Sequence, residues 1–382
     1  MSEIIVFLIC ALLPAYGLRF KIGPLPTTGL EIVLLVAIVI FAYAIFVKKT
    51  LPTHETPAPK LGKLFWTATA LIIVSTVTGI IVAPDKLAAL GIARAYFWEP
   101  MIFSFLLIKA KPDGKKIFKA ALYGLALSAA AIIGYGIFQY FFPRLIPATY
   151  AADRRITSFY SYPNAIALYL APLAPLFLAA LWSAPLALLA IVAIILAQSA
   201  GGMIAVGAAL FTAGLSFKKS RVPTIAATVL AILVLVFAPQ LANLRQQILM
   251  KDWSGRVHQI GWQESLLMLR DHPLFGAGLN GFPTVVKPYH TAKGVEIFQY
   301  PHNIFLTLWS ELGLLGLLGF ILLFIWFFKR TYALRATRYG PLMAASLVAI
   351  LVHGLVDVPY FKNDLSLMFW IFIAITAIME RE

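Results

Sequence analysis

The sequence is poor in cysteine and in charged residues. It has one cysteine, Cys10, and 12% of its 382 residues are charged, about half the fraction usual in soluble domains. A single cysteine excludes a disulfide framework within the chain and any metal site built from several thiolates. The 16 acidic residues form no carboxylate cluster at ligand spacing, so nothing in the sequence requires a metal ion or another cofactor.

Apolar residues, in contrast, make up 61% of the chain and occur in runs that approach the length needed to cross a bilayer. The runs predict an all-α polytopic membrane protein, a single integral membrane domain over 1–382 with about twelve transmembrane helices. The predicted spans are 3–20, 29–47, 64–83, 92–108, 120–142, 163–181, 184–198, 201–217, 222–241, 302–328, 340–359 and 365–380. The last three form a C-terminal part, 302–380.

Basic residues lie at the ends of these spans. Four short clusters are rich in lysine and arginine: 48–63, 109–119, 218–221 and 329–338. If the spans alternate in direction, all four clusters fall on one side, and the positive-inside rule makes that side the cytoplasm. The topology then places both termini in the cytoplasm. Because the net charge of +15 follows helix ends, we expect membrane lipids and no nucleic acid as partners.

Two loops on the other side of the membrane are long enough to hold a site, 143–162 and 241–301. In the second loop, apolar residues at helical spacing over 261–270 predict an amphipathic helix that lies on the membrane. Asp271-His272-Pro273 should end this helix, and Gly276-x-Gly278 should form a turn. A long polar segment at the bilayer edge suggests chemistry on an anionic substrate held in the membrane.

Three polar residues lie at the outer ends of predicted spans. His302 follows a proline and opens a span, where a neutral imidazole can accept or orient the proton of a hydroxyl; a helix-capping or interfacial histidine is the simpler alternative. Asn303 beside it is a typical N-cap residue. Asp357 lies near the outer end of 340–359. Ionisable groups at that depth are costly, so Asp357 is either the partner of an arginine or part of an acceptor site.

Arg155 and Arg256 lie in the two outer loops. A guanidinium group holds phosphate oxygens through paired, planar donors, although arginines at this depth also contact lipid headgroups. Gly276 and Gly278 could expose backbone N–H groups to an anion, but a tight turn is the simpler interpretation. No strand precedes them, as a dinucleotide-binding motif would require.

In combination, these residues resemble the conserved core of the O-antigen ligase and polymerase superfamily. The similar elements are Arg155-Ile-Thr-Ser-Phe159 with Pro163-Asn164, then Arg256, Trp262 and His272-Pro-Leu-Phe-Gly-Ala-Gly278, then Pro301-His302-Asn303 with Glu311-Leu-Gly313, and finally His353-Gly-Leu-Val-Asp357. They cover about 150–370. One departure is Gln198-Ser199-Ala200-Gly201, where many relatives have Ser-Arg-Gly, so a phosphate contact from that arginine is absent here.

The resemblance implies a membrane-embedded, metal-independent glycosyltransferase of GT-C-like architecture in the bacterial inner membrane. Its site would lie on the periplasmic face, with a large loop between the ninth and tenth spans. It would transfer a glycan from undecaprenyl diphosphate to an acceptor hydroxyl, with inversion. The family's essential histidine corresponds to His302 and its two loop arginines to Arg155 and Arg256; Asn164, Asn303, Asp357 and the two glycines are candidate supporting residues.

Several functions are compatible with these motifs, and most of them differ in the acceptor that receives the glycan. O-antigen ligation to lipid A–core, a step of lipopolysaccharide biosynthesis, is the leading one. An O-antigen polymerase, whose acceptor is another lipid-linked glycan, and a protein O-oligosaccharyltransferase fit the same motifs. A transporter of lipid-linked glycans is an alternative of another class, but the sequence has no inverted repeat and its polar residues concentrate in one outer loop.

Overall fold

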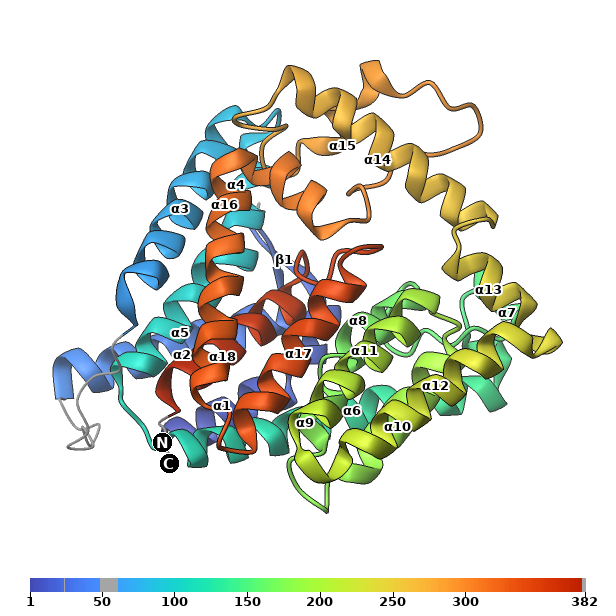
Figure 1. Ribbon diagram of the computed structural model, residues 1–382. Helices are drawn as coiled ribbons and strands as arrows, with labels where there is room; N and C mark the ends of the chain where they lie inside the picture. The colour runs from blue at the N-terminus through green and yellow to red at the C-terminus, as the bar shows by residue number, and fades with distance from the viewer. Residues whose placement is uncertain (24, 49–60, 380–382) are drawn as a thin grey trace.

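The computed structural model describes residues 1–23, 25–48 and 61–379, so most of the basic cluster 48–63 lies outside the described residues. The molecule is mostly helical, as the apolar runs predict. Figure 1 shows long helices packed side by side, with α14 (Trp253–Asp271) and α15 (Phe282–Val285) lying across one end of the bundle. We call this the α14 end; the N-terminus lies at the opposite end.

The remaining elements follow in chain order. The first helices are α1 (Ser2–Ala11), α2 (Gly29–Ala42), α3 (Gly62–Val82), α4 (Lys86–Ile92), α5 (Glu99–Lys109), α6 (Gly114–Phe141), α7 (Ala148–Ala151), α8 (Asn164–Leu170) and α9 (Ala174–Phe177). The later ones are α10 (Ala184–Leu196), α11 (Ala200–Ser216), α12 (Arg221–Phe237), α13 (Ala242–Ile248), α16 (Ile304–Ala333), α17 (Tyr339–His353) and α18 (Asn363–Ile378). Short 3-10 or π turns are η1 (Leu13–Gly17), η2 (Tyr43–Lys48), η3 (Ala93–Trp98), η4 (Pro143–Leu145), η5 (Lys218–Ser220), η6 (Pro239–Leu241) and η7 (Lys287–Tyr289).

Six helices among the described residues are long and apolar enough to cross a membrane: Gly29–Val47, Gly62–Val82, Lys86–Lys109, Gly114–Phe141, Lys218–Phe237 and Ile304–Ala333. Shorter apolar helices occupy five further predicted spans, namely Ser2–Ala11, Ala184–Leu196, Ala200–Ser216, Tyr339–His353 and Asn363–Ile378. The predicted span 163–181 consists of the short helices α8 and α9. Pro172 and Pro175 interrupt it, because proline lacks the N–H that continues a helix. Twelve spans therefore stay a prediction.

The N-terminal segment departs from the all-α prediction. The helix predicted over 3–20 ends at Ala11, and the turn η1 that follows begins at Leu13 and has Pro14 as its second residue. The chain then forms an antiparallel hairpin of β1 (Arg19–Ile22) and β2 (Leu25–Thr28), in which Arg19 pairs with Thr28. The Thr28 hydroxyl accepts a hydrogen bond from the Glu31 N–H and caps α2. This hairpin lies below the α14 end of the bundle (Figure 1).

The bundle has a buried centre and an exposed apolar edge. Every residue of α18 is buried, among α5, α2, α16 and α17, as expected for a helix that is apolar on all sides. In α12, by contrast, no residue is buried, although its side chains are mostly apolar. Apolar surface of this kind is stable against lipid rather than water, so the arrangement fits a membrane protein.

Two helices carry the candidate site. The amphipathic helix predicted over 261–270 is longer in the structure, Trp253–Asp271, because the Asp252 carboxylate accepts from the Gly255 N–H and caps it. It ends at Asp271, before His272-Pro273, as predicted. Helix α16 begins directly after Asn303 and is interrupted at Gly313, which has φ +69°. There the N–H of Leu314 donates to the carbonyl oxygen of Leu274, so the loop after α14 is held against the break.

Candidate functional site

His302 lies at a tight turn immediately before α16. Its backbone has φ +49°, a left-handed conformation that is uncommon for non-glycine residues and that concentrates at functional sites. The next residue, Asn303, caps the helix: its side-chain oxygen accepts from the N–H groups of Phe305 and Leu306. Its amide also donates to the carbonyl oxygen of Leu355 at 3.0 Å. The cap therefore fixes the position of His302 against the segment between α17 and α18.

The imidazole of His302 contacts a buried carboxylate. Its Nδ1 lies 3.4 Å from Oδ1 of Asp357, which is 4% exposed. The second oxygen of Asp357 lies 3.4 Å from the Asn164 amide nitrogen, and the Val358 N–H donates to Oδ1 at 2.8 Å. A carboxylate on Nδ1 orients the ring and leaves Nε2 as the proton acceptor. Three predicted residues, His302, Asp357 and Asn164, are thus brought together from distant parts of the chain.

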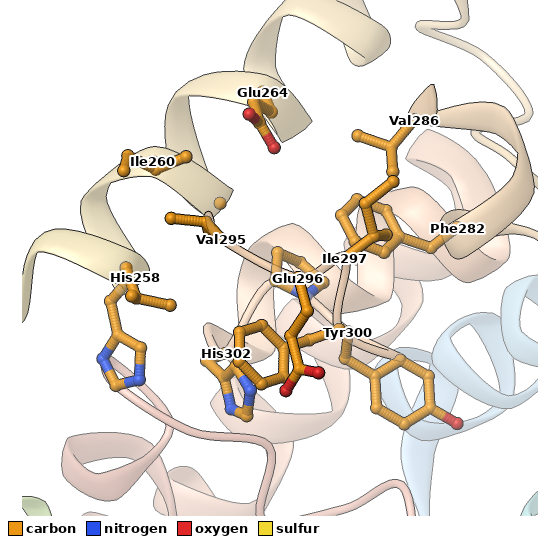
Figure 2. A pocket seen from close by; sticks show the side chains of 14 residues that line it. His258, Ile260, Glu264, Phe282, Val286, Val295, Glu296, Ile297, Tyr300 and His302 are labelled. Atoms are coloured by element: carbon orange, nitrogen blue, oxygen red, sulfur yellow. The ribbon is translucent and has the colours of Figure 1, made fainter. Parts of the chain in front are cut away.

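His258 is a further member of this group. Its ring stacks on that of His302, with centroids 5.1 Å apart and planes at 23°, and Figure 2 shows the two rings next to each other. Burial, followed by the nearby charge of His302, lowers the pKa of His258 to about 4. One helical turn along α14, the indole N–H of Trp262 points at the His302 carbonyl oxygen, 3.4 Å away. Helix α14 therefore supports both the ring and the backbone of His302.

A second contact joins α14 to the loop that leads to His302, and it involves Glu264, which Figure 2 shows on this helix. A carboxylate oxygen of Glu264 on α14 lies 3.0 Å from Nδ1 of His290. The other ring nitrogen of His290, Nε2, lies 3.0 Å from the carbonyl oxygen of Val295. The hydrogen bond with Glu264 raises the pKa of His290. Phe298 then packs edge-on against the His302 ring, with centroids 5.1 Å apart. The loop is thus attached to α14 before it reaches the histidine.

Arg155 and Asp357 line one cavity of about 250 Å³. His258, Trp262 and Asn164 line it as well, so the cavity opens beside the imidazole pair. The Arg155 Nε–H donates to the carbonyl oxygen of Ala197 at 3.2 Å, which leaves its terminal nitrogens available. Burial lowers the pKa of Arg155, but an arginine stays protonated in proteins. The cavity therefore holds a fixed positive charge, and two of its wall residues, His258 and Asp357, contact the His302 ring.

Arg256 has a different position. It is exposed on α14, and it does not line the cavity that holds Arg155. Residues two apart on a helix point in directions about 200° apart, so Arg256 and His258 occupy nearly opposite faces. Among the described residues, its guanidinium group makes no hydrogen bond or ion pair. The structure thus brings Arg155 to the histidines and leaves Arg256 at the outer side of the same helix.

Gly276 and Gly278 form a turn packed against the bundle. Both have positive φ, +63° and +77°. A Cβ on Gly276 would lie 2.4 Å from backbone oxygens of α16, and one on Gly278 would lie 2.7 Å from the backbone at the end of α3. The Gly276 N–H donates to the carbonyl oxygen of His272. The glycines allow close packing of the loop on α16 and α3, and they do not line the cavity beside His302.

Sequence reasoning selected most of this cluster but assigned no role to His258. The signal was present, because His258 and Trp262 are four residues apart and must share one face of a helix. The position of α14 over His302, which gives that face its importance, depends on tertiary packing. Among the described residues, no three His, Cys, Asp or Glu side chains meet in a group that could hold a metal ion.

Comparison with known proteins adds one finding. Residues 185–321 match a family model described as O-antigen ligase. The match includes His258, His302 and Arg256 and extends to the first part of α16, whereas Arg155, Asn164 and Asp357 lie outside it. No curated protein matches the sequence. The match supports an O-antigen ligase-like family for the chain.

Proposed function

We propose that this membrane protein of the O-antigen ligase-like family transfers a glycan from undecaprenyl diphosphate to a hydroxyl group of lipid A–core. The observation that carries the proposal is the pairing of His302 with buried Asp357 at 3.4 Å next to the cavity that contains Arg155. A polarised imidazole and a fixed guanidinium are the two groups that such a transfer needs, one for the acceptor and one for the leaving diphosphate.

In the proposed step, the acceptor hydroxyl oxygen bonds to the anomeric carbon of the donor glycan. The bond between that carbon and the diphosphate oxygen breaks, and the diphosphate leaves with the electron pair. Nε2 of His302 takes the acceptor proton, while Asp357 stabilises the resulting imidazolium through Nδ1–H. A single displacement of this kind inverts the configuration at the anomeric carbon.

Arg155 is the proposed contact to the diphosphate, since it lines the cavity and has free guanidinium donors. Two parallel N–H···O bonds would hold phosphate oxygens as negative charge develops on them. Arg256, on the exposed face of α14, is proposed as a second contact, reached from the outer side of that helix. Because arginine supplies the positive charge in this scheme, we propose that transfer does not depend on a divalent cation.

The same proposal includes the location of the protein and its orientation in the membrane. The α14 end would face the periplasm of a bacterium, and both termini would face the cytoplasm, in the inner membrane. This orientation follows from the basic clusters at the other helix ends. A lipid-linked donor would then approach through the bilayer, which explains a site directly at the ends of membrane helices.

An acceptor panel tests the function. The purified protein is incubated with glycan–undecaprenyl diphosphate and one of three acceptors: lipid A–core, the lipid-linked glycan itself, or a pilin-like protein. We expect a glycosylated product with lipid A–core only, unchanged by EDTA. Product with the lipid-linked glycan or the protein would assign polymerase or protein-modifying activity instead. Product lost in EDTA and restored by magnesium would contradict the metal-independent mechanism.

A further inference from the structure

A second and larger cavity lies behind the N-terminal hairpin. It measures about 610 Å³, and its walls come from the hairpin, from α4 with η3, and from the turn at Asn280. The segment 299–302 makes contact with wall residues of this cavity and of the first one. At its start the Gln299 amide donates to the Asn280 side chain at 2.7 Å, and at its end His302 contacts Asp357. The segment 299–302 therefore links a wall residue of one cavity, Asn280, with a wall residue of the other, Asp357.

One buried carboxylate holds this second cavity together. Glu31 at the start of α2 is 4% exposed. It accepts hydrogen bonds from Arg94 of η3 and from Asn363 at the start of α18, and from the Thr27 hydroxyl of β2 at 2.9 Å. Glu31 thus connects α2 with β2, η3 and α18, and both of its carboxylate oxygens accept hydrogen bonds from the protein. The cavity wall is preformed, and Arg94 is paired with Glu31 and also with the buried Glu99, 3.4 Å from its Nε.

Other polar groups of the cavity remain available to a ligand. Arg19 and Lys21 on β1 are exposed, and neither forms an ion pair with an acidic residue in the described part of the chain. Arg19 lies over the ring of Tyr16, 5.6 Å from its centroid, and also hydrogen-bonds its hydroxyl group. The hydroxyl of Tyr96 makes no hydrogen bond among the described residues. Asp85, the remaining acid, is the N-cap of α4 and accepts from two of its backbone N–H groups at 3.0 Å.

We propose that this cavity binds the phosphorylated oligosaccharide of the acceptor. Aromatic faces and planar amides, here Tyr16, Tyr96 and Asn280, suit the apolar faces and hydroxyl groups of sugars. The two cations on β1, whose charge no acidic residue of the described chain neutralises, suit phosphate groups on those sugars. This assignment deepens the proposed function and rests on it, since it names where the acceptor of that reaction is held.

The chemistry of the transfer gives an independent reason for two cavities. In a direct displacement, the attacking oxygen approaches opposite the leaving group, so the acceptor and the diphosphate must occupy opposite sides of the reacting carbon. Arg155 lines one cavity and the cations of β1 line the other, so separate places for the diphosphate and the acceptor are available. Nearly all of the second cavity also lies outside the segment 185–321 that matches the family model. A part that distinguishes one acceptor from another is expected to differ from the shared core.

Direct binding tests the proposal without requiring turnover. The protein carrying His302→Ala, in nanodiscs, is titrated by calorimetry with deacylated lipid A–core oligosaccharide, before and after phosphatase treatment. We expect binding that phosphatase weakens, and a Kd about tenfold higher when Arg19→Ala and Lys21→Ala are added. Tyr96→Phe, which removes only one hydroxyl group, should raise the Kd by a smaller factor. The matched control is Lys287→Ala with Lys293→Ala, which removes the same charge from exposed positions outside the cavity.

The outcomes separate this proposal from the proposed function. An unchanged Kd in both the double and the Tyr96 variants would overturn the acceptor site, even if wild-type protein catalyses transfer. Weaker binding of the lipid-linked donor in the double variant, with acceptor binding intact, would also overturn it. Phosphate-dependent oligosaccharide binding in a protein that never forms product would support the cavity assignment and refute the transfer. In active protein, we expect the double variant to raise the acceptor KM and leave kcat unchanged.

Discussion

The two cavities at the α14 end are built in different ways. Around His302 the backbone is in a left-handed conformation, the carboxylate of Asp357 is buried, and α14 supports the ring through His258 and Trp262. Behind the hairpin, the cavity is more than twice as large, and its free cations, Arg19 and Lys21, lie on an exposed strand. The surroundings of His302 hold the few atoms of its imidazole ring in one position. The hairpin cavity instead offers a ligand many weak contacts over a wide surface.

This difference indicates a division of tasks. Groups that move a proton must be held within a fraction of an ångström of their partners, and the surrounding structure compensates the strain. Groups that recognise a large polar ligand can be spread out, because each contact contributes only a modest part of the binding free energy. Substitutions near His302 should therefore reduce kcat, substitutions behind the hairpin should raise KM, and substitutions in the supporting loops should change stability.

The largest effect is expected from His302→Ala. Loss of a general base typically lowers the rate 10²- to 10⁴-fold, and a diphosphate leaving group would place the loss toward the lower end. Turnover should fall while donor binding and melting temperature stay close to wild type. The matched control is Asn303→Ala at the neighbouring position, which removes the helix cap and should cost about 1 kcal/mol of stability. Normal turnover by His302→Ala protein would remove this residue from the mechanism.

Asp357→Asn should have the next largest effect, on the order of 10²-fold in kcat. The amide can still touch Nδ1, but it carries no charge to stabilise the imidazolium. The pH profile of kcat should shift relative to wild type, with the acceptor KM unchanged, and a purely structural role would alter the melting temperature instead. If kcat and its pH profile match those of wild type, Asp357 does not act through His302.

Arg155→Lys compares a point charge with a guanidinium fork. A charge-assisted hydrogen bond contributes about 1.5–3 kcal/mol, so donor affinity should fall about 10- to 100-fold, nearly as far as in Arg155→Ala. The same pair of substitutions at Arg256, which is exposed, should have a smaller effect. Nearly full donor affinity in Arg155→Lys would show that only a positive charge is needed. Equal losses in both substitutions of Arg256 would show that it also holds phosphate in bidentate fashion.

Gly278→Ala should change stability rather than chemistry. The residue has φ +77°, and a Cβ would lie 2.7 Å from backbone atoms of α3, so a cost of about 1–3 kcal/mol is expected. Gly207→Ala is the control, since this glycine lies within helix α11 with nothing within 4 Å of its added Cβ. The control should be neutral or stabilising by up to about 1 kcal/mol. Thermal unfolding in detergent distinguishes them, and equal melting temperatures would contradict the packing argument.

The smallest effect concerns pH. The pKa of His258 is lowered to about 4 in the folded protein, whereas an unfolded chain protonates histidine near 6.5. Between these values the unfolded state binds more protons, so the contribution of His258 to stability is present above pH 6.5 and is lost as pH falls toward 4. When the pH is lowered from 7 to 5, the melting temperature of the His258→Gln variant should therefore decrease less than that of the wild type. Identical slopes for the two proteins would show that His258 is not held neutral by burial.

Comparison of the sequence with the structure shows which features a linear pattern can reveal. Apolar runs predicted most helices. Positions at span ends predicted His302 and Asp357, the outer loop predicted Arg155, and the family resemblance added Asn164; the fold brings these four residues together. Patterns could not show that α14 extends back to Trp253 or that its His258 face, and not its Arg256 face, lies against His302. They also could not predict the hairpin cavity, because Arg19, Glu31, Arg94 and Asn363 are far apart in the chain and meet only through packing.

The central claim is that the protein, through His302 and the adjacent Arg155 cavity, breaks the bond between a glycan and a lipid diphosphate and joins the glycan to an acceptor. The most direct measurement counts both products, free undecaprenyl diphosphate and glycosylated acceptor, from purified protein in vesicles. We predict that they appear in equal amounts, only when donor and acceptor are both present, and not with His302→Ala. Movement of intact donor across the vesicle membrane without release of undecaprenyl diphosphate would contradict the account and assign the protein as a transporter.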